Sequence, residues 1–136
     1  MSQIIEIGIG NECYGIHIGD IQEIIKMQEI TRLPNQSPYF KGVIHLRGHI
    51  VSVISLRARL NMIEVPYTKA TRIVVLGQEG EQVGVIVDHV NRVSRYTELK
   101  DPPDNSSASH QALIHGIGTT ASGFLCILNV AHIIDV

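Results

Sequence analysis

Short runs of isoleucine and valine recur along the chain between clusters of glycine, proline, asparagine and aspartate. Apolar runs of about four to eight residues between turn-forming residues are typical of β-strands, whereas amphipathic helices need longer runs with a period of about 3.6. The pattern therefore predicts a mainly β protein. The strands are expected at residues 4–9, 14–18, 42–46, 50–56, 71–76, 82–88, 111–117 and 123–128.

Two short helical turns are expected between these strands. Pro38 can begin a turn within residues 37–41, and LRARL at residues 56–60 consists of residues that favour a helix. The composition of residues 101–109, DPPDNSSAS, is that of a loop. Residues 65–67, Val-Pro-Tyr, are expected to connect two halves of the chain.

The two halves resemble each other. YGIHIGDIQEII at residues 14–25 matches VGVIVDHVNRVS at residues 83–94 in its glycine and apolar positions, at an offset of 69 residues. Gly42 matches Gly116, and IVSVISL matches FLCILNV, both at an offset of 74. A unit of about 65 residues is marginally stable alone, so the repeat predicts two β-units that share a buried hydrophobic seam. Chance similarity between strands rich in Ile and Val is the alternative, and the matched glycines argue against it.

Charge and length narrow the class of protein. The 136 residues suit one compact unit, and 11 Lys and Arg against 13 Asp and Glu give a net charge of −2 without a block of like charge. This balance argues against binding nucleic acid or anionic membrane through a basic patch. MSQIIEIGIG lacks a basic leader, and no apolar run approaches the roughly 18 residues that cross a bilayer. We expect a cytoplasmic protein without membrane insertion, with reduced Cys13 and Cys126.

No pattern in the sequence indicates catalysis, a metal or a cofactor. GIGNECYG begins like a dinucleotide fingerprint, but Cys13 occupies the third glycine position and no helix pattern follows. His45 and His49 are four residues apart among strand-like neighbours, a spacing that suits a metal only on a helix. Cys126, within FLCIL, is expected to be a buried core thiol. His110, after Ser109, is expected in a solvated loop with no triad around it.

The segment GVIHLRGHIVSVISLR predicts a hairpin. Alternation places Ile44 and Leu46 on one face, and Val51 and Val53 fall on the same face if the chain reverses at Arg47-Gly48. Gly48 can adopt a positive φ, which makes a tight reversal inexpensive. Arg47 then projects from the tip. From these residues alone, Arg47 has a second interpretation as a soluble turn residue without a binding role.

These segments resemble the CheW-like chemotaxis coupling domain over nearly the whole chain. YGIHIGDIQEII resembles the family pattern YG[IV]x[IV]xxVxEI, and ITRLPNQSPYFKGVIHLRGHIVSVISLR resembles IxxxPxxPxxIxGVINLRGxVVPVIDLR. TRIVVL, VGVIVDHVNRV and GIGTTASGFLCILNV follow in the same order. The resemblance implies two tandem five-stranded SH3-like β-barrels packed on a shared hydrophobic seam. Within one domain at 1–136, we expect the first barrel at 12–68 and the second at 71–136, with a strand near 1–11 packed on the second.

The resemblance also implies a function without catalysis. Such proteins are adaptors that link methyl-accepting chemoreceptors, at their cytoplasmic tip, to the regulatory domain of the histidine kinase CheA. The expected protein has no cofactor, is recruited from the cytoplasm to receptor arrays, and is a monomer in dilute solution. A scaffold of a parallel chemosensory pathway that does not control swimming is the alternative, and a small metal- or ligand-binding β protein is a further one.

The family's binding positions fall on five residues. The resemblance implies receptor binding by Ile21, Glu23 and Arg47, and kinase binding by Ile18, Ile21, Arg47 and Gly48. Glu23 and Arg47 are expected to pair at the surface of one barrel. Ile18 and Ile21 flank a Gly-Asp corner, and the sequence leaves open whether they are exposed for a partner or belong to the core.

Four residues depart from the family pattern. His45 replaces its Asn, Ser52 its Pro, Ser55 its Asp, and Asn129 the Asp of the closing segment. We expect the fold to tolerate all four. They leave open whether the adaptor serves a main chemotaxis system or a parallel pathway.

Overall fold

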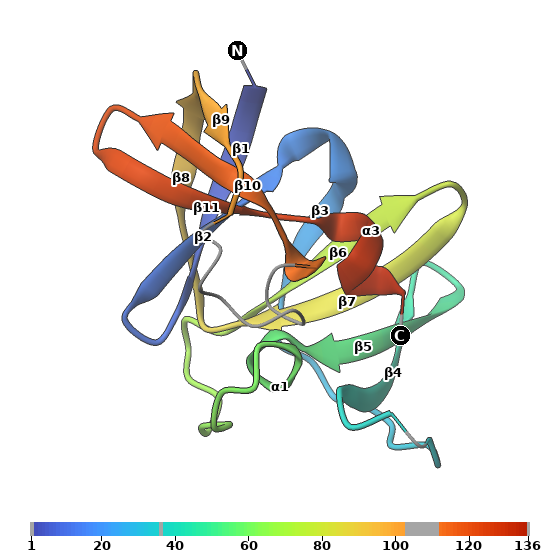
Figure 1. Ribbon diagram of the computed structural model, residues 1–136. Coiled ribbons are helices and arrows are strands. Elements are labelled where there is room, and N and C mark those ends of the chain that lie inside the picture. The colour runs from blue at the N-terminus through green and yellow to red at the C-terminus, as the bar shows by residue number, and fades with distance from the viewer. Residues whose placement is uncertain (1, 36, 103–111, 136) are drawn as a thin grey trace.

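The structure is a computed structural model that describes residues 2–35, 37–102 and 112–135 (Figure 1). Strands dominate it, as the apolar pattern predicts. The strands are β1 (Ser2–Ile9), β2 (Glu12–His17), β3 (Ile21–Lys26), β4 (Phe40–Leu46), β5 (His49–Ser55), β6 (Arg72–Gln78), β7 (Glu81–Val87), β8 (His89–Tyr96), β9 (Leu99–Lys100), β10 (Ile114–Thr120) and β11 (Gly123–Leu128). The short helical segments are η1 (Ile18–Asp20), α1 (Leu56–Arg59) and α3 (Val130–Ile134).

The strands form two sheets. The first sheet has five strands in the order β3-β6-β7-β5-β4, and the second has six in the order β8-β1-β2-β11-β10-β9. The mainly β class with two sheets and short helices is therefore confirmed. The second sheet exceeds the expected five strands because the two-residue β9 pairs with β10 at its edge. The SH3-like form of the two units stays a prediction.

Strand pairing divides the chain differently from the expected units 12–68 and 71–136. Strands β6 and β7 complete the first sheet, while β2 lies in the second, so each sheet draws strands from both sides of residues 68–71. The cause is a parallel pair in each sheet, β5 with β7 and β2 with β11. Parallel neighbours need a long crossover connection, which a local reading of the sequence does not reveal. Strand β1 does pair with β8, as expected for a strand near residues 1–11. Figure 1 shows blue β1 and β2 beside orange and red β10 and β11.

The internal repeat is confirmed by these parallel pairs. In the first sheet Ser52 lies opposite Val83, and in the second Cys126 lies opposite Tyr14. Adding 74 to Ser52 gives Cys126, and subtracting 69 from Val83 gives Tyr14, the two offsets found in the sequence. The two sheets are therefore built on one strand arrangement, used twice.

The helix that follows each parallel strand is capped in the same way. Ser55 is the N-cap of α1 and its Oγ accepts a hydrogen bond from the Ala58 N–H. Asn129 is the N-cap of α3 and its Oδ1 accepts from the His132 N–H. Serine and asparagine replace the family's aspartates at these two positions, and both can cap a helix as an aspartate does. The two substitutions thus preserve the fold.

Several elements differ from the expectation. Residues 37–41 form a hydrogen-bonded turn instead of a helical one, because Phe40 already begins β4 and its N–H donates to the Ser37 carbonyl. Strands β3 and β8 were not predicted, since polar residues interrupt their apolar pattern. Residues 112–113 are helical, so the strand expected at 111–117 starts at Ile114. Most of the expected loop at 101–109 lies outside the described residues, whereas the helical turn at 56–60 is confirmed as α1.

The predicted hydrophobic seam lies between the two sheets. Its buried side chains include Ile7 and Ile16 from the second sheet and Ile54, Val74 and Val85 from the first. A separate cluster fills the first sheet: Ile44, Val51, Val53, Ile73, Val75 and Ile86. A third, smaller cluster fills the second sheet: Ile4, Tyr96, Leu125 and Ile127. Burial of so many large aliphatic side chains is the main driving force for this fold.

Candidate functional site

The hairpin between β4 and β5 carries the predicted charged pair. Arg47 and Gly48 form its two-residue turn with φ values of 51° and 82°, the positive values that a type I′ turn requires. Arg47 Nε donates to Glu23 Oε2 at 3.0 Å and Nη2 donates to Oε1 at 3.2 Å. The predicted pairing of Glu23 with Arg47 within one unit is therefore confirmed.

This pair joins the two edges of the first sheet. Glu23 lies on edge strand β3, and Arg47 follows edge strand β4. The arginine side chain is 75 % exposed and the glutamate side chain 25 %. The hydrogen bonds from Arg47 lower the pKa of the Glu23 carboxyl. Because exposed ion pairs contribute little to stability, this one chiefly fixes the orientation of a guanidinium that partners can reach.

The structure separates Ile21 from Glu23. Ile21 lies opposite Leu76 while Glu23 lies opposite Val75, so a bulge at Gln22 sends the two side chains to opposite faces of β3. Ile21 is half-buried and packs against the core between the sheets. Ile18, in η1, is also half-buried.

An exposed isoleucine lies on the same hairpin as Arg47. Ile50 on β5 is 66 % exposed and lies opposite His45, close to the hairpin turn. It lines a shallow hollow with Gln22, His49, Gly80 and Gln82. We call Glu23, Arg47, Gly48 and Ile50 the first hairpin surface. The apolar pattern did not mark Ile50, because alternation alone does not show which face of a hairpin is covered.

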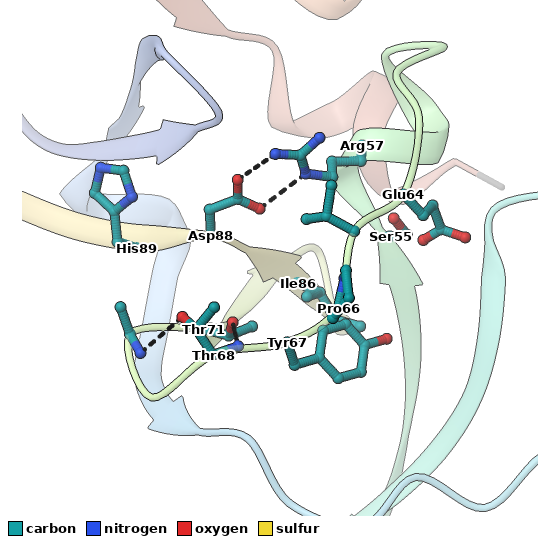
Figure 2. Close-up of a pocket in the computed structure, with 12 residues that line it drawn as sticks. Ser55, Arg57, Glu64, Pro66, Tyr67, Thr68, Thr71, Ile86, Asp88 and His89 are labelled. Carbon is teal, nitrogen blue, oxygen red and sulfur yellow. Dashed lines mark hydrogen bonds and ion pairs between the residues drawn. The ribbon is translucent and has the colours of Figure 1, made fainter.

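A second ion pair lies where the two sheets meet (Figure 2). Arg57 Nε donates to Asp88 Oδ1 at 3.0 Å and Nη2 donates to Oδ2 at 2.5 Å. The Gly10 N–H donates to the same carboxylate at 2.7 Å, and Arg57 Nη1 donates to the Ile63 carbonyl at 2.8 Å. These bonds tie α1 to the β1–β2 turn, to the residue between β7 and β8, and to the connection after α1.

A cavity of about 230 Å³ lies beside this pair. Figure 2 shows Asp88 and Arg57 at its wall, with His89 and Tyr67 around it. Both members of the ion pair that lines the cavity have hydrogen-bond partners within the chain. The pair therefore connects the two sheets. The sequence signal for this junction was a charged residue directly after the buried strand VGVIV.

The junction makes stability depend on pH. Hydrogen bonds from Arg57, together with the Gly10 N–H, hold the pKa of Asp88 below its usual value. An unfolded aspartate titrates near about 3.9, so the unfolded chain binds the proton more tightly than the folded chain. This contribution is complete above about pH 5 and is lost as the pH falls through the folded pKa. Urea titrations should show a smaller acid loss of unfolding free energy for Asp88→Asn than for the wild type. Identical pH slopes for the two proteins would refute this role of Asp88.

Two histidines considered as a metal pair point apart. His45 lies opposite Ile50 and its neighbour Leu46 lies opposite His49, so the His45 and His49 side chains lie on opposite faces of the hairpin. Among the described residues, no three His, Cys, Asp or Glu side chains are grouped so that they could hold a metal ion. His110 lies outside the described residues.

Both cysteines are free thiols, and Cys126 is placed differently from the expectation. Cys126 is half-buried beside Tyr14 and lies on the face of β11 opposite the core residues Leu125 and Ile127, so it is not a core thiol. Burial raises the pKa of its thiol, which disfavours the reactive thiolate. Cys13 is exposed, and its Sγ accepts a hydrogen bond from Asn91 Nδ2 at 3.2 Å.

In the parts of the chain that the structure describes, no helix has the length and apolar character needed to span a membrane.

The chain is similar to known proteins over nearly its whole length. The family model described as "CheW-like domain" matches residues 3–136. The chain is 34 % identical over 124 residues to the chemotaxis protein CheW of Bacillus subtilis (strain 168), covering 90 % of this chain and 80 % of that protein. It is 32 % identical over 133 residues to the chemotaxis protein CheW of Helicobacter pylori, covering 97 % of this chain and 81 % of that protein.

A solved structure has the same fold. The crystal structure of scaffolding protein TtCheW from Thermoanaerobacter tengcongensis matches with a TM-score of 0.85 and 30 % sequence identity. The match covers 95 % of this chain and 84 % of that one. Family model, relatives and fold agree over nearly the whole length, and the chain therefore belongs to the CheW-like domain family.

Proposed function

We propose that this protein is an adaptor that couples methyl-accepting chemoreceptors to the histidine kinase CheA in chemotaxis. The observation that carries the proposal is the Glu23–Arg47 pair on the hairpin of the first sheet. Membership of the CheW-like family supports it, as do relatives whose names are those of chemotaxis proteins. In this proposal the protein works in the cytoplasm and is recruited to receptor arrays at the membrane.

The first hairpin surface supplies the chemistry for binding. Arg47 is held in place by two hydrogen bonds, yet most of its side chain remains accessible. A pre-oriented guanidinium loses less side-chain entropy on binding than a free one. Gly48 leaves open space at the turn, since a Cβ there would have no neighbour within 4 Å. A partner backbone can therefore approach the turn closely, with Ile50 as an apolar contact beside it.

The two isoleucines take a different part in this proposal. Ile21 packs against the core on the other face of β3, so it supports the strand that positions Glu23. Ile18 begins the short η1 segment before that strand. Their half-buried positions leave part of each side chain for a partner contact. Ile21→Asp would disturb folding as well as binding, so Arg47 is the better position for a test.

The proposal is tested by pull-down with the receptors and kinases encoded by the same genome. We expect the tagged protein to retain the cytoplasmic hairpin of a receptor and the regulatory domain of a kinase, together and separately. The identity of the retained receptor also decides between a swimming system and a parallel chemosensory pathway. Retention of neither partner at micromolar concentration would contradict the proposal.

We predict that the isolated protein is a monomer in dilute solution. The exposed large apolar side chains include Ile50 on one hairpin and Phe124 on another, on different sheets, and aromatic residues are only 4 % of the chain. Stable dimers usually need a larger continuous apolar interface with aromatic anchors. Adaptor contacts can remain individually weak because clustered receptors raise the effective concentration. Sedimentation velocity at micromolar concentration should give a mass near 15.0 kDa. A dimer that persists on dilution would be the opposite result.

A further inference from the structure

The repeat places a second hairpin surface on the second sheet. Strand β8 is the counterpart of β3, and the β10–β11 hairpin is the counterpart of β4–β5. Arg92 occupies the position of Glu23, since each follows the same bulge and lies one offset of 69 apart. Arg92 Nη2 donates to Ser122 Oγ at 2.9 Å, where Ser122 is the counterpart of Gly48. In both units a side chain on the edge strand is therefore hydrogen-bonded to the hairpin turn. The edge strand supplies a carboxylate, Glu23, in the first unit and a guanidinium, Arg92, in the second.

A groove of about 750 Å³ opens at this second position. Its walls carry two arginines, Arg92 and Arg95, and the hydroxyl-bearing residues Ser94, Thr97, Thr119, Thr120 and Ser122. The single acid in the lining, Glu6, is buried and accepts a hydrogen bond from Arg92 Nε at 3.2 Å. One carboxylate against two guanidinium groups leaves the groove with a net positive charge.

The groove has an unpaired hydroxyl group and exposed apolar side chains within the described residues. The Oγ of Ser94 is buried and has no hydrogen-bond partner there. Val93 is 55 % exposed at the groove, and Phe124, opposite Thr119 across the hairpin, is 74 % exposed. A buried hydroxyl without a partner costs free energy, and large apolar side chains next to a charged groove are typical of protein-binding surfaces.

We infer that this groove binds a protein segment that presents a carboxylate beside an apolar side chain. The carboxylate meets Arg95, and the apolar side chain packs on Val93, which lies on the same face of β8, and on Phe124. The inference rests on the proposed adaptor function, which supplies two protein partners, and it adds the chemistry by which one of them is selected. A partner that fits the acidic and basic pair of the first hairpin surface meets a net positive charge here. The reversal from Glu23 to Arg92 thus lets one chain distinguish two partners.

Surface variants test this without disturbing the ion pair between Arg92 and the buried Glu6. Arg92 itself is unsuitable for substitution, because its loss would remove the ion-pair partner of the buried Glu6. Arg95→Glu reverses an exposed charge, and Phe124→Ser removes the most exposed aromatic side chain of the surface. Lys69→Glu, in the exposed turn before β6, is the matched control. Binding of the full chain to the receptor hairpin and to the kinase regulatory domain of the same genome is measured by calorimetry at low and high salt.

The expected result is that Arg95→Glu and Phe124→Ser both weaken the binding of the same partner by at least about tenfold. Lys69→Glu should leave the binding of both partners unchanged. The affinity of that partner should fall with added salt. A photoreactive amino acid at position 124 should cross-link to a peptide that contains Asp or Glu. Affinities within twofold of the wild type for both variants, or cross-linking to a basic segment, would overturn this inference but not the proposed function. A wild-type chain that binds neither partner would overturn the proposed function, and this inference with it.

Discussion

Arg47→Glu is expected to weaken binding of the receptor tip or the kinase regulatory domain by at least about tenfold. The variant places two carboxylates where a bidentate ion pair now fixes the hairpin tip to β3. The repulsion with Glu23 displaces the turn, and the partner loses its cation. Calorimetry with purified partners measures the affinity, and urea unfolding shows whether the fold has survived.

Stability should change little in this variant, because the Arg47 side chain is mostly exposed. The double variant Glu23→Arg/Arg47→Glu separates two roles of the pair. It restores an ion pair of the opposite orientation, so any recovery of binding reports on turn geometry, and any remaining loss reports on the sign of the exposed charge. Lys69→Glu again serves as a control for charge reversal elsewhere. Unchanged affinities for Arg47→Glu would remove Arg47 from the binding surface.

Gly42→Ala is expected to lower the free energy of unfolding by about 3 kcal/mol. Gly42 has a φ of 142°, and a Cβ built on it would lie 2.2 Å from the backbone oxygen of Thr31. That oxygen accepts the Val43 N–H at 2.9 Å, so the Thr31 segment and β4 cannot move apart without losing a hydrogen bond. A Cβ built on Gly116, the repeat counterpart, would likewise lie 2.7 Å from the Lys100 backbone oxygen. The two matched glycines therefore have one physical cause, the close approach of a neighbouring backbone at a bulge.

Gly48→Ala is the matched control for this prediction. Gly48 also has a positive φ, 82°, but a Cβ there has no neighbour within 4 Å. Its substitution should cost only the backbone strain of a non-glycine residue in that region, about 1 kcal/mol. Urea unfolding of both variants measures the difference. Equal losses for Gly42→Ala and Gly48→Ala would show that the close contact with Thr31 is not rigid.

Local patterns in the sequence predicted the parts of the fold that depend on neighbouring residues. The β4–β5 hairpin follows from alternation around Arg47-Gly48, and α1 follows from helix-favouring residues after a strand. The placement of β6 and β7 in the first sheet and of β2 in the second could not be predicted in this way. It depends on parallel pairing between strands far apart in the chain, and both sheets offer similar Ile- and Val-rich edges.

The same limit applies to the candidate site. The Glu23–Arg47 pair was predicted correctly from the family resemblance. Receptor binding by Ile21 stays a prediction. The sequence does not reveal that Ile21 and Glu23 lie on opposite faces of β3, because the bulge at Gln22 that reverses the side-chain alternation leaves no mark in it. The sequence did not single out Arg92 although the repeat aligns it with Glu23, because the two halves match in glycine and apolar positions and differ in charge at this one.

Reconstituted kinase activity tests the central claim most directly. Receptor-containing membranes and the kinase from the same genome are mixed with and without this protein, and autophosphorylation of the kinase is followed over time. If the protein is the coupling adaptor, receptor-dependent stimulation appears only when it is present, and Arg47→Glu reduces that stimulation while Lys69→Glu does not. Equal phosphorylation rates with and without the protein, in mixtures where receptor and kinase are each active, would contradict the account.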